Sequence, residues 1–379
     1  MSSFLFLHAD TPWVYTLAAR LAERHSVHAA QFADWLVYWR QSPAWPLDRS
    51  AAMQHTMKVL PTGYAGRLSW VARPFLRRTV DRWRAELRSE SGEEPWVVVC
   101  YPYAAPWTRN VPDDRLIYYN LDDYTLYRPE RAERIREQED KLIDRAAHTL
   151  CLSQHQVDAL RERRPHRASR IVHFPLGVRD SFLNPTPEEP PIANTVVYIG
   201  TVGDRVDWDL VVNVVERCPD LTFTVVGGPV DGRASADWER KRARVLRQSN
   251  VEHPGRVPQG EVPEYYHSRA VNWIPYDLEH PFNQAACPTK IMDGIASGRP
   301  VVSTSVPECM LYSEWIEIAD SGKATVSALH DRAVPDAHNA EHAQEQVTFA
   351  RRNTWDSRAR TFEALLNDQR RPEMASSAI

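Results

Sequence analysis

The chain has 379 residues, of which 43% are hydrophobic and 25% are charged, and its formal net charge is −4 at pH 7. This length exceeds one typical domain and fits two, and the slightly acidic balance excludes a general electrostatic attraction to nucleic acid. The five cysteines are dispersed without CxxC or Cys/His spacing, which argues against a disulfide framework and against a structural zinc site.

The sequence indicates neither a membrane-spanning nor a secreted chain. No run of about 18 apolar residues occurs, and the opening MSSFLFLHAD lacks the basic region and the cleavage site of a signal peptide. We therefore expect a cytoplasmic protein with reduced thiols, in which the opening residues form a first strand.

Short apolar runs, typical of buried parallel strands, alternate with segments of helical periodicity along the first half of the chain. Helices are predicted between the runs, for example at Trp13–Arg24 and Arg131–Ala147. The predicted strands are Phe4–His8, Val27–Phe32, Trp96–Tyr101, Leu116–Asn120, Thr149–Ser153 and Ile171–Phe174.

A proline-rich segment, Leu183–Asn194, separates the two halves. It holds four prolines, each of which fixes φ and lacks an N–H donor, so we expect a linker there. The second half repeats the strand and helix alternation, and a last helix is predicted near Trp355–Leu366. Its predicted strands are Val196–Gly200, Phe223–Gly227, Val271–Tyr276 and Val301–Thr304.

The pattern predicts an α/β chain with two doubly wound parallel-sheet domains. Residues 1–182 form the first domain, 183–194 the linker and 195–350 the second domain. Residues 351–379 form a C-terminal helix and a tail, and this helix could pack back on the first domain. The closing residues Arg370–Ile379 are expected to be disordered.

The most informative segment is CPTKIMDGIASGRPVVS, residues 287–303. A helix predicted from Thr289 places Lys290 and Asp293 three residues apart near its N-terminal end. Free N–H groups at a helix start, with a lysine beside them, suit a diphosphate. An aspartate one turn later can accept hydrogen bonds from ribose hydroxyls. An ordinary helix with a surface Lys–Asp pair is the alternative.

Small residues follow the first strand of the second domain at Gly200, Thr201 and Gly203. They allow the backbone to approach a phosphate or a sugar. Arg205 could supply a second cation for a phosphate, and Asp207 lies just after it. A solvated helix start is an equal alternative for both.

Polar residues also follow two strands of the first domain. Asp122 and Asp123 come after Leu116–Asn120, and His8 and Asp10 come at the end of the first strand, at the sheet edge where functional groups gather. One carboxylate of the Asp pair could act as a general base. An aspartate that caps the next turn is the alternative. His8 could contact a substrate or serve as another base, and a structural histidine is equally consistent.

The segment Arg67–Arg88 holds seven arginines and two acids. An apolar stripe runs along it at helical spacing, and a basic amphipathic helix with tryptophans can lie in the headgroup region of an anionic leaflet. A helix packed on the first domain is the alternative. The chain lacks the basic domain and stacking module of a nucleic-acid-binding protein. The stripe consists of Leu76, Val80, Trp83 and Leu87.

The segment PTKIMDGIASGRPVVSTSVPE resembles a motif of GT-B glycosyltransferases, in the family-four-like branch associated with teichuronic-acid and exopolysaccharide synthesis, and more distantly the xanthan glucuronosyltransferases. Other segments are similar in the same order. They are LIYYNLDDYTLY, EQEDKLIDRAAHTLCLSQ, VVYIGTVGDRVDWDLVVNVVERCPDLTFTVVGGP and NVEHPGRVPQGEVPEYYHSRAVNWIPYDLEHPFNQAACPTK.

This resemblance implies two Rossmann-like domains that face each other across a cleft, with the donor on the second domain and the acceptor on the first. Lys290 would neutralise the donor diphosphate, and Tyr276 would contact the nucleotide. Asp293 replaces the family's ribose-binding glutamate, and Asp122 is the implied catalytic base. Ala285 stands where retaining relatives carry a second glutamate, which favours inversion as a hypothesis.

The resemblance further implies a metal-independent transferase without a cofactor, whose co-substrate is a nucleotide-sugar, most simply a UDP-sugar. The acceptor would be a glycan or a lipid-linked glycan, and the protein would work in the cytoplasm or at the inner face of the membrane. Two alternatives stay open: a nucleotide-sugar epimerase or hydrolase of the same fold, and a non-catalytic glycan- or nucleotide-binding scaffold.

Overall fold

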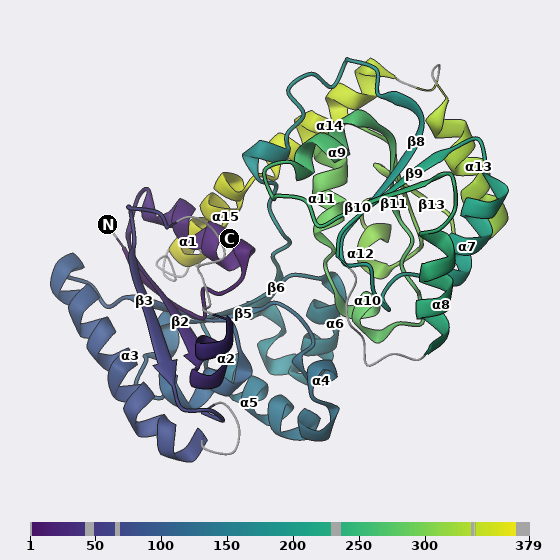
Figure 1. Cartoon of the computed structure of the whole chain (residues 1–379). Coiled ribbons are helices and arrows are strands. Elements are labelled where there is room, and N and C mark those ends of the chain that lie inside the picture. Colours follow the sequence, from purple (N-terminus) through teal and green to yellow (C-terminus); the bar gives the residue numbers. More distant parts are fainter. Residues whose placement is uncertain are drawn as a thin grey trace. The chain divides into compact units, whose positions relative to one another are not determined.

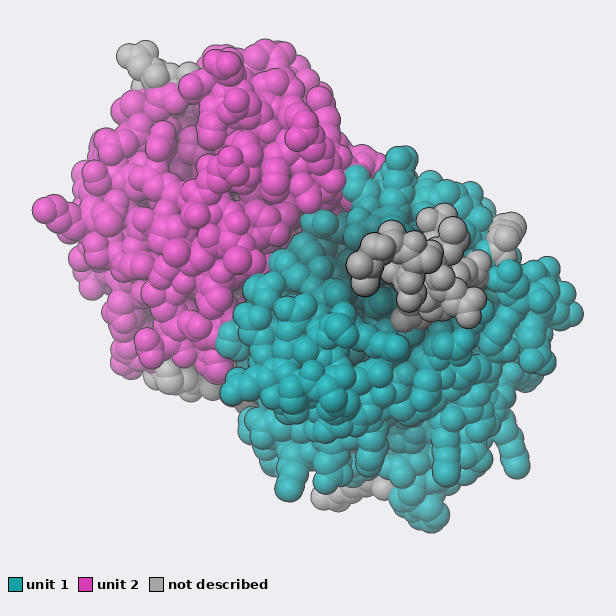
Figure 2. Space-filling view, turned by 180° about the vertical axis from the view of Figure 1, so that it is seen from behind, with its two compact units in different colours: residues 1–175, 355–379 teal, residues 176–354 magenta. Residues whose placement is uncertain are grey.

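The computed structural model describes residues 2–41, 49–64, 69–228, 236–334, 337 and 339–368. The chain forms two compact units, Met1–Pro175 with Trp355–Ile379 and Leu176–Thr354, which Figure 2 shows in separate colours. The tail expected at Arg370–Ile379 lies outside the described residues. Among the described residues, no helix has the length and apolar character needed to cross a bilayer.

The first unit contains a seven-stranded sheet in the order β3-β2-β1-β4-β5-β6-β7, in which every neighbouring pair is parallel. The side chains of β1, β4 and β5 are buried on both faces, which is why their sequences are continuously apolar. The strands are β1 (Ser3–Leu7), β2 (Ser26–Asp34), β3 (Gln54–Leu60), β4 (Trp96–Val99), β5 (Leu116–Asn120), β6 (His148–Cys151) and β7 (Ile171–His173).

The helices of this unit include one that returns from the far end of the chain. In Figure 1, α15 (yellow) lies beside α1 (purple), and the Phe362 ring of α15 meets Phe4 of β1 at a centroid distance of 5.9 Å. Arg24 pairs with Glu363 at 3.0 Å and secures the same contact. The helices are α1 (Pro12–Ala22), α2 (Trp35–Gln41), α3 (Ser69–Ser91), α4 (Tyr124–Tyr127), α5 (Ala132–Arg145), α6 (Gln154–Arg163) and α15 (Trp355–Asp368).

Helix α3 turns the apolar stripe of the basic segment inward. Leu76, Val80, Trp83 and Leu87 are at most 3% exposed and belong to the core cluster of the first unit. The stripe is therefore unavailable to a membrane, and the expectation that it forms the lipid-facing surface of Arg67–Arg88 is wrong. The stripe instead packs the helix on its own domain, as the alternative reading had it.

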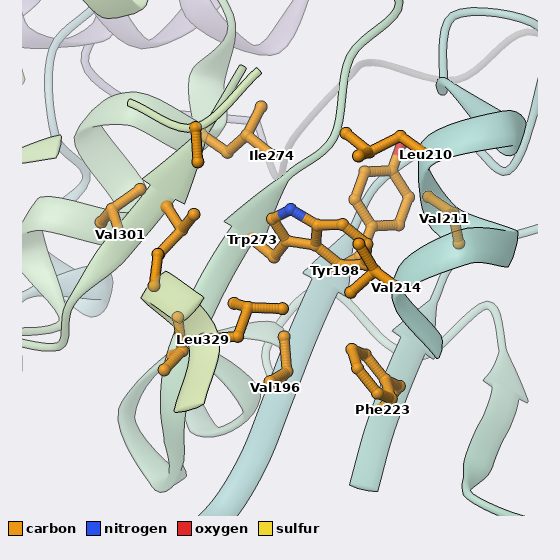
Figure 3. Packing of buried hydrophobic residues seen from close by; sticks show 14 of the residues in the cluster. Val196, Tyr198, Leu210, Val211, Val214, Phe223, Trp273, Ile274, Val301 and Leu329 are labelled. Atoms are coloured by element: carbon orange, nitrogen blue, oxygen red, sulfur yellow. The ribbon is translucent and has the colours of Figure 1, made fainter. Parts of the chain in front are cut away.

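The second unit contains a six-stranded parallel sheet in the order β10-β9-β8-β11-β12-β13. Figure 3 shows Trp273 of β11 among Val196, Tyr198 and Val214 in the buried cluster that holds helices on this sheet. The strands are β8 (Ile192–Ile199), β9 (Thr222–Val226), β10 (Val251–Gly255), β11 (Arg269–Ile274), β12 (Val301–Ser303) and β13 (Ile316–Ile318). The helices are α7 (Trp208–Arg217), α8 (Ala236–Val245), α9 (Val262–Ser268), α10 (Pro281–Ala285), α11 (Thr289–Ala296), α12 (Pro307–Met310), α13 (Gly322–Ala333) and α14 (Ala340–Arg352).

The proline-rich segment is part of the second unit. Its Asn184 is 2% exposed, and the Asn184 amide Nδ2 donates to the Ser297 carbonyl at 2.8 Å. The Arg299 guanidinium donates to the Pro187 carbonyl, and residues 192–194 already belong to β8. The contacts thus group residues 176–194 with the second unit, whereas the sequence predicted a linker at residues 183–194 between two domains.

Candidate functional site

The first cluster of predicted site residues lies beyond the carboxyl end of β8. Gly200 has φ 156°, and a Cβ added there would lie 2.5 Å from Lys290 Cε and 2.6 Å from its Nζ. A Cβ at Gly227, which follows β9, would lie 1.7 Å from the Gly200 carbonyl oxygen. Only glycine fits both positions, because backbone packs on backbone and the Lys290 side chain lies against the turn.

Lys290 occupies the first turn of α11 and is held by aromatic residues. Its ammonium donates to the Tyr276 hydroxyl at 2.6 Å and lies 5.5 Å from the Tyr198 ring centroid. Pro288, the N-cap of α11, makes no side-chain capping bond, and Thr289 is the first helical residue. The amide end of the helix and the lysine together form a positive site at the sheet edge.

Asp293 lies one turn further along α11 and is 9% exposed. Desolvation raises the pKa of its carboxyl to about 7, although the charges of Arg179 and Lys290 pull the pKa down. The Arg179 guanidinium stacks 4.0 Å from the Phe182 ring centroid. Sequence reasoning missed Arg179, because no motif surrounds it and it was assigned to the first domain.

Arg205 reaches the same cluster from the loop after β8. Its guanidinium lies 5.5 Å from the Tyr276 ring centroid and donates to Asn283 Oδ1 at 2.9 Å. Tyr276 therefore contacts both Arg205 and Lys290. The structure brings together two cations that the sequence placed 85 positions apart, counting from 205 to 290.

The other three predicted residues of this loop have structural contacts. The Asp207 carboxylate caps α7 by accepting from the Leu210 amide at 2.9 Å, which matches the alternative of a helix start. The Thr201 carbonyl accepts from the Tyr198 hydroxyl, and the Gly203 carbonyl accepts from the Trp208 indole, both at 2.8 Å. These bonds fix the path of the turn, and Thr201 is exposed at its tip.

In the first unit, a cavity of about 340 Å³ opens beside the ends of β4 and β5. Its walls are mostly aromatic, and Asp122 and Arg128 supply charged groups. Tyr101 Oη donates to Asp10 Oδ1 at 3.3 Å, which ties the exposed Asp10 to the rim. The aromatic lining residues are Trp13, Tyr101, Tyr103, Tyr124 and Tyr127.

The two adjacent aspartates have different tasks. Asp123 caps α4, because its carboxylate accepts from the Thr125 amide at 2.9 Å and from the Thr125 hydroxyl at 2.6 Å. Asp122 lines the cavity, where its Oδ2 accepts from the Tyr127 hydroxyl at 2.7 Å and its Oδ1 accepts from the Asp123 amide. Asp122 is therefore the carboxylate of the pair that faces the cavity.

His8 has no exposed surface and a positive φ of 70°. Its ring lies 4.9 Å from Tyr101 and 5.4 Å from Trp107, measured between centroids, and desolvation lowers its pKa to about 3. A base must reach the hydroxyl that it deprotonates and hold a proton at working pH. The structure thus contradicts the expectation that His8 acts as a base and makes it part of the aromatic core beneath the cavity.

Over the described ranges, no cluster of three or more His, Cys, Asp and Glu side chains has a geometry suited to a metal ion. The cations of the second unit's site are side chains and a helix start.

Two doubly wound parallel-sheet units in one chain are the architecture of the GT-B fold. Solved structures agree over nearly the whole chain. HepE of Anabaena, solved in complex with UDP and glucose, is similar with a TM-score of 0.69 and 14% identity, covering 97% of this chain and 100% of that one. Sucrose-phosphate synthase of Thermosynechococcus elongatus gives a TM-score of 0.68 and 16% identity, covering 97% and 99%.

The second unit also matches a sequence family. Residues 193–333 match the family described as Glycosyl transferases group 1. The putative teichuronic acid biosynthesis glycosyltransferase TuaH of Bacillus subtilis (strain 168) is 31% identical over 110 residues, which span 29% of this chain and 26% of that protein. The chain thus has the GT-B fold, and the match to the group 1 family lies within its second unit.

Proposed function

We propose that the protein transfers a sugar from a nucleoside-diphosphate donor, most simply a UDP-sugar, to a hydroxyl of a glycan or lipid-linked glycan. The observation that carries this proposal is Lys290, held against Gly200 and the Tyr276 hydroxyl at the uncapped start of α11. An ammonium and a helix N-terminus stabilise the negative charge of a diphosphate. HepE, which shares the fold, was solved with UDP.

Each of the other donor contacts has a proposed task. Arg205 adds a second cation near Tyr276, and these positive groups take the role that a metal has in other transferases. Asp293 accepts hydrogen bonds from the ribose hydroxyls in its ionised form. Tyr276 contacts the nucleotide, and the Gly200 turn allows the phosphate or sugar to approach the backbone.

In the first unit, the proposed acceptor site is the aromatic cavity. Aromatic faces suit the apolar faces of sugar rings, and Asp122 takes the proton of the attacking hydroxyl. A carboxylate has about four acceptor positions, so the hydrogen bonds from Tyr127 and the backbone are compatible with this role. Because donor and acceptor groups belong to different units, transfer requires both. We propose that the protein works in the cytoplasm, either free or at the inner face of the membrane.

Thermal-shift titration with UDP, GDP, dTDP and CMP, followed by assays with their sugars, tests the proposal. A ligand that binds the native state stabilises it by an amount that grows with the logarithm of the ligand concentration divided by its Kd. Lys290→Ala should weaken binding of the stabilising nucleotide by roughly tenfold or more, the effect of a lost charge-assisted bond. Lys323→Ala removes an exposed lysine of the same unit and serves as the matched control.

Equal nucleotide binding by Lys290→Ala and the control would contradict the donor site. Assays with and without acceptor separate transfer from its alternatives, because a hydrolase or epimerase consumes the donor alone. If the protein bound nucleotide-sugars of the panel but turned none of them over, it would be a non-catalytic scaffold. Activity that survives a chelator supports metal-independent transfer.

A further inference from the structure

A buried carboxylate that the proposed donor and acceptor contacts do not use lies in α5. Glu139 is 5% exposed, and carboxylates are rarely buried unless they are paired. Its Oε2 accepts from the Arg163 guanidinium of α6, and its Oε1 accepts from the Tyr118 hydroxyl of β5 at 2.7 Å. Burial and the charge of Glu139 raise the pKa of Tyr118 well above its ordinary value, so the phenol remains a donor. Glu139 thus joins two helices and a strand inside the first unit.

The same carboxylate is linked to the aromatic cavity through Asn120, the last residue of β5. Asn120 has no exposed surface. Its amide Nδ2 donates to Glu139 Oε1 at 3.0 Å and to the Asp122 carbonyl at 3.3 Å, and Asp122 lines the cavity. One buried amide group therefore bridges Glu139 and the backbone of the residue that carries the proposed base.

Glu139 fixes the direction in which the Asn120 amide points. If the amide were turned over, its oxygen would face the Glu139 carboxylate and the Asp122 carbonyl, which are both acceptors. In the observed orientation Asn120 Oδ1 is buried and has no hydrogen-bond partner among the residues that the structure describes. An unpaired buried acceptor is destabilising, so the bonds to Glu139 and Asp122 outweigh that cost.

Stability alone gives little reason for this buried carboxylate. Well-packed apolar residues in place of a buried ion pair often leave a protein equally stable or more stable. The helix that carries Glu139 packs against α4, which begins directly after Asp123, and Figure 1 shows α4 and α5 beside each other. The placement of Glu139 therefore favours a task in the geometry of the loop that carries Asp122.

We propose that Glu139 and Asn120 are positioning residues for Asp122. Glu139 orients the Asn120 amide, and this amide holds the Asp122 backbone so that the carboxylate stays in the cavity. A displacement of about 1 Å at a reacting group can cost on the order of 100-fold in rate, so a base benefits from a backbone that is held from inside the domain. This step rests on the proposed function, in which Asp122 takes the proton of the attacking hydroxyl.

Steady-state kinetics of Asn120→Ala test the positioning. The variant loses the bond to the Asp122 carbonyl and should lower kcat roughly 10- to 100-fold, while the KM for the donor stays unchanged because Lys290 belongs to the other unit. Thr79→Val is the matched control. It removes a buried hydroxyl of the same unit, which donates to the Phe75 carbonyl at 3.0 Å, and should retain kcat. Melting temperatures show that both variants are folded at the assay temperature.

Two replacements of Glu139 separate positioning from a purely structural role. Glu139→Gln keeps an oxygen that can accept from Asn120 and should retain most of kcat, although the lost charge beside Arg163 lowers the melting temperature. Glu139→Met has a similar length but no such acceptor, and it should lose kcat as Asn120→Ala does. If Glu139→Met does not fold, Asn120→Ala decides alone.

Unchanged kcat in Asn120→Ala would overturn the proposal, and so would an equal loss of kcat in Thr79→Val. A higher KM at unchanged kcat would assign the network to substrate binding and overturn it as well.

Hydrogen exchange of the backbone amides separates this inference from the proposed function. Asn120→Ala should speed exchange in residues 121–127 relative to wild type and to Thr79→Val, because the loop loses its anchor. Faster exchange, in a protein whose wild type transfers no sugar, would refute the transferase proposal and leave Asn120 as the anchor of the Asp122 backbone. Transfer by the wild type, with unaltered exchange and kcat in Asn120→Ala, would refute the positioning alone.

Discussion

At the scale of single residues, adjacent or similar side chains differ in what they do because the backbone directs them differently. The sequence identified the pair Asp122 and Asp123 but could not tell which carboxylate caps the turn. It likewise gave His8 both a chemical and a structural reading. The burial that decides between those readings comes from Tyr101 and Trp107, residues far from His8 in sequence.

Replacement of each aspartate by alanine distinguishes their roles. Asp122→Ala should reduce transfer by roughly 10²–10⁴-fold, the usual contribution of a general base, while UDP binding is retained. Asp123→Ala should cost about 1 kcal/mol of stability through the lost cap, with much of the turnover kept. Steady-state kinetics and thermal unfolding measure both effects. Near-normal turnover by the Asp122→Ala variant would show that Asp122 is not the catalytic base.

Burial gives Asp293 a pH-dependent effect on stability. Its folded pKa of about 7 lies above the ordinary value of 3.8, so its contribution favours folding while it is protonated and is lost as pH rises through about 7. A shift of this size corresponds to on the order of 4 kcal/mol.

Asp293→Asn should therefore gain stability relative to wild type between about pH 4 and about pH 8, as measured by urea unfolding at each pH. In the same window UDP affinity of the wild type should rise with pH, because the ionised carboxylate is the better acceptor for ribose hydroxyls. A stability difference between the two proteins that stays constant with pH would contradict the assignment.

At the scale of elements, the sequence predicted the central strands and missed β3, β10 and β13. All three lie at the edges of their sheets. β3 is only partly buried, β10 contains a proline and a glycine, and β13 has three residues, so none shows the continuous apolar run of a central strand. The start of α11 at Thr289 was predicted to the residue, because Pro288 directly precedes it.

The turn between β8 and α7 offers a test at this scale. Gly200→Ala introduces a Cβ at 2.5 Å from Lys290 Cε and a side chain at an unfavourable φ. We expect a loss of about 1–3 kcal/mol of stability and weaker UDP binding, because the ammonium must move from Tyr276. Gly260→Ala, where a Cβ has open space, is the control. Melting curves without and with UDP measure stability and UDP binding. Equal effects of Gly200→Ala and Gly260→Ala on both would show that the Cβ at position 200 does not clash with Lys290.

At the scale of the whole molecule, α15 belongs to the unit that the chain left at Pro175. The sequence offered this as one option, since an amphipathic helix does not identify the surface it covers. Phe362 is fully buried against Phe4, and the ion pair of Arg24 with Glu363 adds a polar contact. The first unit is therefore complete only with this helix.

Phe362→Ala should lower the stability of the first unit by about 3–5 kcal/mol, the usual cost of a buried aromatic truncation. Arg360→Ala changes an exposed side chain of the same helix and should have little effect. Limited proteolysis of the Phe362→Ala variant should release fragments of residues 1–175 before those of residues 176–354. Simultaneous digestion of both units would contradict an effect confined to the first.

The return of α15 to the first unit sets the order in which the two units can complete folding during translation. Every residue of the second unit precedes Trp355, so its sheet can close as soon as that stretch leaves the ribosome. In the first unit, although it is synthesised earlier, Phe4 of β1 and the contact face of α1 stay uncovered until α15 emerges. Transiently exposed apolar surface of this kind is what chaperones bind. The half of the protein that is made first is thus the half that finishes folding last.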